Sequence, residues 1–287
     1  MEESRHEKPP NTVFPEIATN AAIFLQADRP LYSICSIVTR PAEYAEMLET
    51  FERGGFKAGV NTEFLYLDNS TANQFEAYSG YNLFLRNARG QYIILCHQDL
   101  LLLEDGIARL DAIIAELDAF DPTWALFGNG GGVWPNKIAV RMSDKFGGNQ
   151  SIGGPFPVSC LSLDENFIVV RADANLALSR DLSGFHFYGT ELCIVAAHLG
   201  YSSYVVDFHL YHKGAATQDK TFFEIRKAMI EKYSHLAGPR MLTTTCSEFV
   251  VTPWSMLTRL ANTHYGTRIS MFLNKLFRPR QTSTSKK

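Results

Sequence analysis

The chain has 287 residues, of which 46% are hydrophobic and 20% are charged. This composition is typical of a globular enzyme and excludes a disordered or fibrous protein. The formal net charge is −3, and because residues 249–287 contribute seven basic and no acidic residues, residues 1–248 carry −10. An acidic body argues against a nucleic-acid-binding core, so we expect no nucleic-acid partner.

The first half of the chain predicts alternating strands and helices after a polar lead-in over residues 1–29. Apolar or β-branched runs predict strands over 31–39, 62–68, 91–96 and 123–128. Apolar residues at helical spacing predict a helix between each pair of strands. Strands that are apolar along their whole length are buried on both faces. The expected fold is therefore an open, mostly parallel, doubly wound α/β sheet with helices on both faces.

The pattern changes after Gly128. The stretches "GNGGGVWPNK" and "DKFGGNQSIGGPFP" predict long glycine-rich loops. Further strands are expected over 165–173 and 202–212, and further helices over 189–199 and 219–236. We expect three parts: the lead-in over 1–29, one α/β domain over 30–217, and a C-terminal helical extension with a basic tail over 218–287.

Polar side chains follow three predicted strands at the carboxyl edge, where such a sheet binds its ligands. Asp99 offers a hard oxygen to Mg²⁺ or Mn²⁺, and histidine is also acceptable to Mn²⁺. The alternative is that Asp99 only caps a helix beginning at Leu100–Leu103. Asp68 either accepts from a nucleobase N–H or only closes a turn. The three groups are Thr39-Arg40, Asp68-Asn69-Ser70 and His97-Gln98-Asp99.

Three further residues each have a functional and a structural interpretation. His212 follows a predicted strand, so it is either a metal ligand or a structural histidine. Glu191 lies in the first turn of a predicted helix, where it is either a general base or a partner of the helix dipole. Arg86 faces either phosphates or solvent. The glycines at 128–132 lack the spacing of a P-loop, and no dinucleotide-binding G-x-G-x-x-G follows the first strand.

Six phrases together resemble the nucleotide-sugar glycosyltransferases of the GT-A fold, family 2 type, in a bacterial branch with an H-Q-D signature. They run in the family's order over roughly residues 31–214. The phrases are "YSICSIVT", "EFLYLDNS", "YNLFLRNARGQYIILCHQDL", "LDENFIVVRAD", "GFHFYGTELC" and "GYSSYVVDFHLYHKG".

This resemblance implies an inverting glycosyltransferase with a nucleotide-sugar donor, for which a UDP-sugar is expected, and a glycan or lipid-linked hydroxyl acceptor. It implies a role in bacterial surface-polysaccharide assembly. Asp99 and His212 would hold Mn²⁺ or Mg²⁺, and Glu191 would be the catalytic base. The nucleotide-binding residues would be Thr39, Arg40, Asp68, Asn69, Arg86, His97 and Gln98.

The sequence departs from the family pattern at two positions. His97 stands where the family has the first Asp of its D-x-D motif, and Gly189 stands where the base is expected, two residues before Glu191. The alternative function is therefore an inactive sugar-nucleotide-binding or scaffold module of the same fold. A nucleotidyltransferase is disfavoured, because no glycine-rich basic loop follows the first strand.

The segment after Ser247 mixes aromatic, leucine and basic residues. Its helix either packs on the domain or lies at a membrane interface as a basic amphipathic helix. The expected face consists of Ile269, Phe272, Leu273 and Leu276, beside Arg268, Lys275 and Arg278. No apolar run reaches the roughly 20 residues that span a bilayer. Because the N-terminal residues are polar, we expect a cytoplasmic protein, with peripheral contact at the inner face of the membrane as the alternative for its tail.

Overall fold

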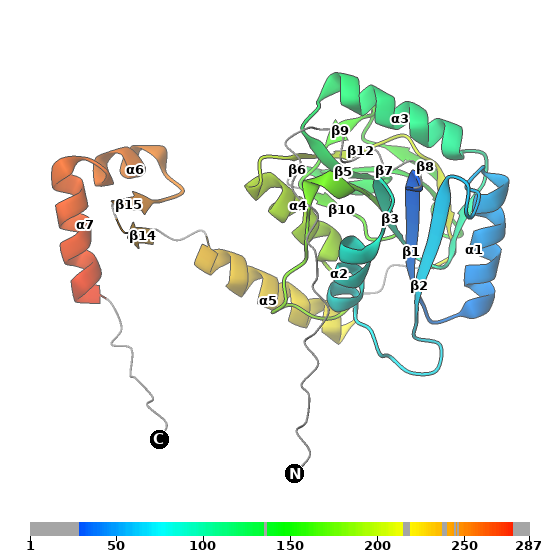
Figure 1. The fold of residues 1–287 in the computed structure, drawn as a ribbon, viewed down its shortest axis with the longest axis horizontal. Helices are drawn as coiled ribbons and strands as arrows, with labels where there is room; N and C mark the ends of the chain where they lie inside the picture. The colour runs from blue at the N-terminus through cyan, green and yellow to red at the C-terminus, as the bar shows by residue number, and fades with distance from the viewer. Residues whose placement is uncertain are drawn as a thin grey trace, which may run out of the picture.

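The computed structural model describes residues 29–134, 137–214, 219–236, 240–243, 245 and 247–277 (Figure 1). Its centre is a seven-stranded sheet in which five strands share one direction, while β9 and β11 run the opposite way. The order is β2 (Thr62–Asp68), β1 (Tyr32–Val38), β3 (Tyr92–Cys96), β11 (Phe167–Arg171), β5 (Trp124–Gly128), β12 (Ser202–Val205) and β9 (Val158–Ser159). The prediction of a largely parallel α/β sheet is confirmed.

Helices cover both faces of this sheet (Figure 1). One face carries α1 (Pro41–Arg53) and α3 (Ile107–Phe120), and the other carries α2 (Ala77–Asn87), α4 (Tyr188–His198) and α5 (Lys220–Leu236). Strand β1 contributes to both cores: Ile34 packs with α1 and α3, whereas Cys35 packs with α2 and α4. Alternate side chains of a strand point to opposite faces, so an apolar run of this kind needs cover on both sides.

A second sheet of six strands forms largely where the sequence predicted loops. Its order is β10 (Ser162–Leu163), β6 (Gly130–Trp134), β7 (Lys137–Asp144), β13 (Leu210–His212) and β4 (Leu100–Leu102), with β8 (Gly148–Ile152) paired to β7. The loop prediction is wrong for β6, β7 and β8. A Cβ on Gly131 would lie 2.2 Å from the carbonyl oxygen of Ser162. Glycine is therefore used inside β6 because β10 approaches it so closely.

Two predicted elements also divide differently. Leu100–Leu102 is strand β4 and not the start of a helix, so Asp99 caps no helix; α3 begins only at Ile107. The single strand predicted over 202–212 is two strands, with β12 in the first sheet and β13 in the second. The chain therefore passes from one sheet to the other just before His212.

The region after Gly214 has two distinct parts. Helix α5 packs on the α/β domain, since Ile225 and Met229 are buried in the core beneath α2 and α4. A separate C-terminal unit follows, made of β14 (Arg240–Thr243), β15 (Glu248–Val251), α6 (Ser255–Ala261) and α7 (His264–Phe277). It contains a hairpin beside the predicted helices. Among the described residues, no helix is long and apolar enough to cross a membrane.

Candidate functional site

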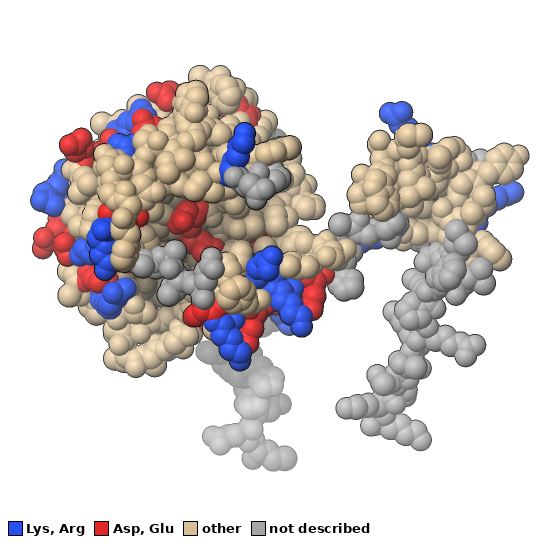
Figure 2. Space-filling model, turned by 180° about the vertical axis from the view of Figure 1, so that it is seen from behind, with Lys and Arg blue, Asp and Glu red and all other residues tan. Residues whose placement is uncertain are grey.

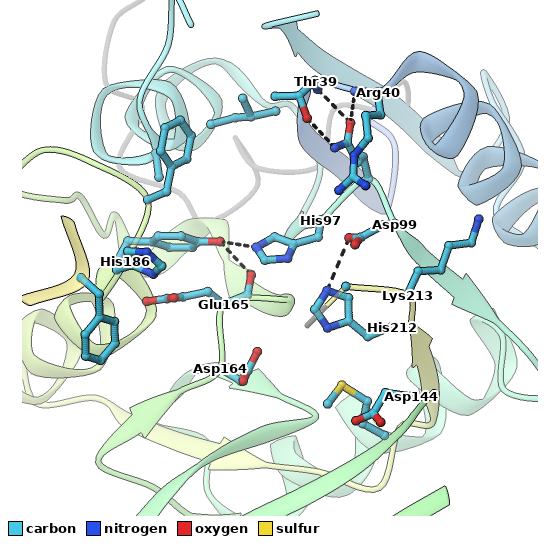
Figure 3. Close-up of a pocket in the computed structure, with 18 of the residues that line it drawn as sticks. Thr39, Arg40, His97, Asp99, Asp144, Asp164, Glu165, His186, His212 and Lys213 are labelled. Carbon is cyan, nitrogen blue, oxygen red and sulfur yellow. Dashed lines mark hydrogen bonds and ion pairs between the residues drawn. The ribbon is translucent and has the colours of Figure 1, made fainter. Parts of the chain in front are cut away.

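His97, Asp99 and His212 form a group whose ligand atoms all lie within 4.8 Å of one another (Figure 3). His97 and Asp99 follow the end of β3. His212 ends β13, which pairs with β4 so that His212 lies opposite Leu100. This pairing sets Nε2 of His212 3.4 Å from Oδ1 of Asp99. The predicted ligands Asp99 and His212 are therefore brought together, and His97 joins them.

The contacts of His97 indicate which of its nitrogens is free. Its Nε2 lies 3.2 Å from the hydroxyl of Tyr188, and that hydroxyl donates its proton to the carbonyl oxygen of Glu165 at 2.7 Å. Because the tyrosine has a single proton to donate, Nε2 of His97 must carry a hydrogen and donate to the tyrosine oxygen. Its Nδ1 then keeps a lone pair, which is the form in which a histidine binds a metal.

The charges within the group also suit a cation. Burial raises the pKa of Asp99, but the hydrogen bond and charge of His212, with the charge of His97, outweigh burial and lower that pKa to about 2. Burial and the charge of His212 lower the pKa of His97. At neutral pH His97 and Asp99 therefore offer a neutral imidazole and an ionised carboxylate, which are metal-binding forms. Burial lowers the pKa of His212, but the hydrogen bond and charge of Asp99 outweigh burial and raise that pKa, so a bound cation would replace a proton on His212.

The position of Gly214 also indicates that there is room for a metal ion beside the group. A Cβ at this position would lie 2.7 Å from Oδ2 of Asp99 and 3.0 Å from Nε2 of His212. The chain therefore leaves a space beside the group that any other residue would fill. One carboxylate and two imidazoles suit Mn²⁺ better than Mg²⁺, which prefers oxygen ligands.

Thr39, Arg40 and Gln98 form one wall of the same pocket (Figure 3). Oε1 of Gln98 accepts from the backbone N–H of Thr39 at 2.8 Å and of Arg40 at 2.7 Å, and its Nε2 donates to Oγ1 of Thr39 at 2.7 Å. Gln98 is buried, so its amide fixes the turn after β1. The guanidinium of Arg40 remains at the rim, paired with Glu43 at 3.0 Å.

The other predicted nucleotide contacts do not line this pocket. Asp68 accepts the N–H of Ser70 at 2.8 Å and closes a turn. Asn69 is buried and holds its own loop through the backbone N–H of Phe75 at 3.0 Å. Arg86 is exposed on α2. The turn interpretation of Asp68 and the solvent interpretation of Arg86 fit their positions, and the nucleotide-binding interpretation does not.

Glu191 also points away from the pocket. Its side chain is 0% exposed, and it accepts from the backbone N–H of Ser179 at 3.0 Å and from the hydroxyl of Tyr233 at 2.9 Å. These bonds tie α4 to α5 and to the loop before α4. A base must reach the proton that it removes, so the position of Glu191 corrects the expectation that it is catalytic.

Two carboxylates that sequence reasoning missed face the pocket instead: Asp164 and Glu165 (Figure 3). They precede β11, whose residue Phe167 pairs with Cys96 of β3. Because β11 is antiparallel to β3, its start lies at the edge where β3 ends. An acidic pair directly before a buried strand was the available signal, but ligands were expected at the carboxyl ends of parallel strands. Acidic atoms gather in a hollow on the face drawn in Figure 2.

The carboxyl group of Glu165 lies at the N-terminus of α4. Burial and the charge of Asp164 raise the pKa of Glu165 to about 8, although backbone N–H groups of Phe187, Tyr188 and Gly189 bond the carboxylate and oppose this. A Cβ on Gly189 would lie 2.5 Å from the carbonyl oxygen of Leu163. Glycine therefore stands there because β10 packs directly on the helix start. A carboxyl group with a pKa near the working pH suits proton transfer.

No family model matches the chain. Over 218 residues it is 38% identical to a protein of Fuscovulum blasticum described as ATP synthase subunits region ORF 6, an alignment covering 74% of this chain and 87% of that one. The chain belongs to the family of that protein. Its description names a gene region and no reaction.

Two solved structures are similar in part. The mannosyltransferase PcManGT from Pyrobaculum calidifontis, in complex with GDP-Man and Mn²⁺, gives a TM-score of 0.43 at 12% identity, over 73% of this chain and 62% of that one. TarS 1-349 of S. aureus gives 0.39 at 11% identity, over 63% and 60%. The chain thus matches about six-tenths of each. Both scores are below 0.5, so the fold is defined by the sheet order above.

Proposed function

We propose that the chain is an inverting, metal-dependent glycosyltransferase that uses a nucleotide-sugar donor and a hydroxyl acceptor. The observation that carries the proposal is a single pocket of about 1020 Å³ that holds both a metal-binding group and an acidic pair. Three parts are needed for this reaction: a place for the diphosphate, a base on the opposite side, and room for two substrates between them.

The cation would be held by His97, Asp99 and His212. When bound, it would neutralise the charge that develops on the leaving diphosphate. Thr39 and Arg40 lie beside this group, and the Arg40 guanidinium at the rim is suited to a phosphate oxygen. We therefore place the nucleotide along the β1 and β3 side of the pocket.

Glu165 would accept the proton of the acceptor hydroxyl. As the oxygen of the acceptor forms its bond to the anomeric carbon, the bond to the diphosphate breaks and the proton passes to the Glu165 carboxylate. Attack from the side opposite the leaving group inverts the anomeric carbon, and no covalent intermediate with the protein is formed. Asp164 adds negative charge beside Glu165 and raises its basicity.

The deciding experiment is a thermal-shift series with UDP-, GDP- and other nucleotide sugars, each with and without Mn²⁺. Binding at 100 times Kd stabilises a protein by about 2.7 kcal/mol. We expect Mn²⁺-dependent stabilisation by one nucleotide class in the wild type, its loss in Asp99→Asn, and its retention in Asp173→Asn. Asp173 is a matched control, because it follows the far end of β11. If no nucleotide sugar stabilises the protein in the presence of Mn²⁺, the proposal is wrong.

A turnover assay distinguishes an active glycosyltransferase from an inactive sugar-nucleotide-binding module. A wild type that binds nucleotide with Mn²⁺ but neither hydrolyses nor transfers the sugar would be the inactive sugar-nucleotide-binding module. The buried position of Glu191 removes the first candidate for the base. An active enzyme would therefore use Glu165 as its base, and Glu165→Gln should nearly abolish turnover while nucleotide binding remains.

A further inference from the structure

The C-terminal unit differs from the rest of the chain in how it distributes its side chains. Its polar side chains hold it together: Asn262 bonds the backbone of Val250 in both directions, at 2.8 Å and 2.7 Å, and Oγ1 of Thr258 lies 2.9 Å from that of Thr252. Val250 is buried, whereas α6 contains no buried residue. The unit therefore packs partly through polar contacts and leaves large apolar side chains outside.

These outward side chains cover both helices of the unit. Their exposed fractions run from 44% to 75% in Trp254, Met256, Leu257, Leu260, Ile269 and Phe272. Ile269 and Phe272 are three residues apart, so they lie on one face of α7. Leaving these apolar side chains in contact with water is unfavourable, because burial of each one would stabilise the protein. Contiguous exposed apolar side chains mark an interaction surface.

The charge of the segment identifies the chemistry of the partner. From Arg240, where the unit begins, to Lys287 there are eight basic residues and one acidic residue, Glu248, and no acidic residue follows it. Arg259 and Arg268 are exposed on α6 and α7, beside the apolar side chains. Figure 2 shows the described atoms of this unit in tan and blue. The partner must therefore offer negative charge at its surface and apolar groups just beneath.

Helix α5 shows what an ordinary surface helix of this chain looks like. It buries Ile225 and Met229 against the domain, although it exposes Phe223 and Ile230. Two of its exposed cations pair with acidic residues one turn away, Lys220 with Glu224 at 3.2 Å and Lys227 with Glu231 at 3.8 Å. Neither α6 nor α7 has an acidic residue for such pairing. A second copy of the unit would bring the same excess of cations against itself, which disfavours a dimer through this surface.

We propose that the C-terminal unit binds the surface of an anionic lipid bilayer. Trp254, Leu260 and Phe272 would enter the boundary between headgroups and acyl chains, while Arg259 and Arg268 would contact the lipid phosphates. The unit lies on the bilayer and does not cross it. This inference is independent of the proposed glycosyl transfer, since no residue of the pocket takes part in it.

The test is sedimentation of the full chain with vesicles of phosphatidylcholine alone or mixed with phosphatidylglycerol. We expect binding only to the mixed vesicles, weakened by salt because the phosphate contacts are electrostatic. Each cation near an anionic surface contributes about fivefold in affinity, so Arg259→Gln with Arg268→Gln should weaken binding about 25-fold. Lys220→Gln with Lys227→Gln, which removes the paired cations of α5, should leave binding unchanged.

The apolar contribution needs its own pair of variants. Trp254→Ser with Leu260→Ser should abolish binding to the mixed vesicles, whereas Phe120→Ser, at an equally exposed apolar residue of α3, should not. Trp254 is also a direct probe, because Trp124 is 0% exposed and Trp134 can be replaced. In a Trp134→Phe background, mixed vesicles should shift tryptophan emission to the blue, and adding Trp254→Phe should remove that shift.

Three outcomes would overturn the proposal. In the first, the full chain stays in the supernatant with the mixed vesicles. In the second, the chain binds but neither the arginine nor the apolar variants weaken it. In the third, sedimentation velocity shows a dimer that these same variants dissociate, which would identify a second copy as the partner. The arginine variants are surface changes, so they remain informative even if the apolar variants fold poorly.

Discussion

The two walls of the pocket are built from opposite chemistry. The wall at the ends of β1 and β3 is held by the neutral amide of Gln98 and carries a cation at Arg40, whereas the wall at the start of β11 carries the carboxylates Asp164 and Glu165 (Figure 3). His97, Asp99 and His212, the proposed metal ligands, lie between them. A pocket divided in this way can take a negatively charged leaving group on one side and a proton on the other. The following predictions test that division.

The largest effect is expected from Glu165→Gln. It removes the proton acceptor but keeps the size of the side chain, so kcat should fall by a factor of about 10² to 10⁴. Mn²⁺-dependent nucleotide binding should remain, because the other wall is unchanged. Steady-state kinetics and calorimetry measure the two effects separately.

The matched control is Glu191→Gln, at the other glutamate near the start of α4. An amide cannot accept both the Ser179 N–H and the Tyr233 hydroxyl as the carboxylate does, so we expect a loss of about 1 to 3 kcal/mol in unfolding free energy. Turnover of the folded protein should stay close to that of the wild type. If Glu191→Gln loses turnover and Glu165→Gln keeps it, the assignment of Glu165 as the base is wrong.

The amide wall is tested by Gln98→Leu. This change leaves the backbone N–H groups of Thr39 and Arg40 without the acceptor that the buried Gln98 supplies, and it should cost about 1 to 3 kcal/mol of stability. Nucleotide affinity should fall with it, whereas the pH dependence of turnover should not move. Gln98→Glu keeps an acceptor oxygen and is the conservative comparison; denaturant unfolding and nucleotide Kd are the measurements. Equal nucleotide Kd in Gln98→Leu and wild type would show that this wall does not bind the nucleotide.

The space between the walls is tested by Gly214→Ala. The added methyl group would press on Asp99 and His212, and overpacking of this kind costs about 1 to 3 kcal/mol. We expect Mn²⁺ affinity to fall by at least about tenfold, as measured by calorimetry. Gly154→Ala is the control, because the nearest atoms to a Cβ there are at an ordinary 3.5 Å. Unchanged Mn²⁺ affinity in Gly214→Ala would place the metal elsewhere.

The raised pKa of Glu165 also predicts a pH dependence of stability, which changes gradually over several pH units. The pKa of Glu165 is raised from 4.5 to about 8, so between these values the folded state binds more protons than the unfolded state. The contribution of Glu165 to the free energy of unfolding should therefore fall as pH rises through this window, by at most about 1.4 kcal/mol per pH unit. Denaturant unfolding of wild type and Glu165→Gln at several pH values isolates it. Parallel curves for the two proteins would contradict the raised pKa.

The parallel strands of the first sheet could be predicted because one rule places their ligand-binding ends. Strands that share a direction end at one edge, so Thr39 and Asp99 were placed together from sequence alone. Asp164 and Glu165 were missed because β11 is antiparallel, and nothing in an apolar run shows its direction. The second sheet was missed because glycine in a strand resembles glycine in a loop.

The error over Glu191 has a geometric cause. Successive residues of a helix are turned by about 100°, so a residue two positions along points about 200° away. Gly189 faces Leu163 of β10 and the side chain of Glu165, and Glu191 therefore faces the interior, toward Tyr233. Glu191 is only two residues from the position where the family has its base, but its side chain points in nearly the opposite direction.

The pairing of β4 with β13 has a consequence for biosynthesis. His97 and Asp99 leave the ribosome together with the first strands of the sheet, but His212 is made only after both sheets have received most of their strands. An incomplete chain can thus assemble the neighbours of Asp99 and still lack one ligand. The three candidate ligands of the proposed cation are therefore complete only when most of the α/β domain has been synthesised.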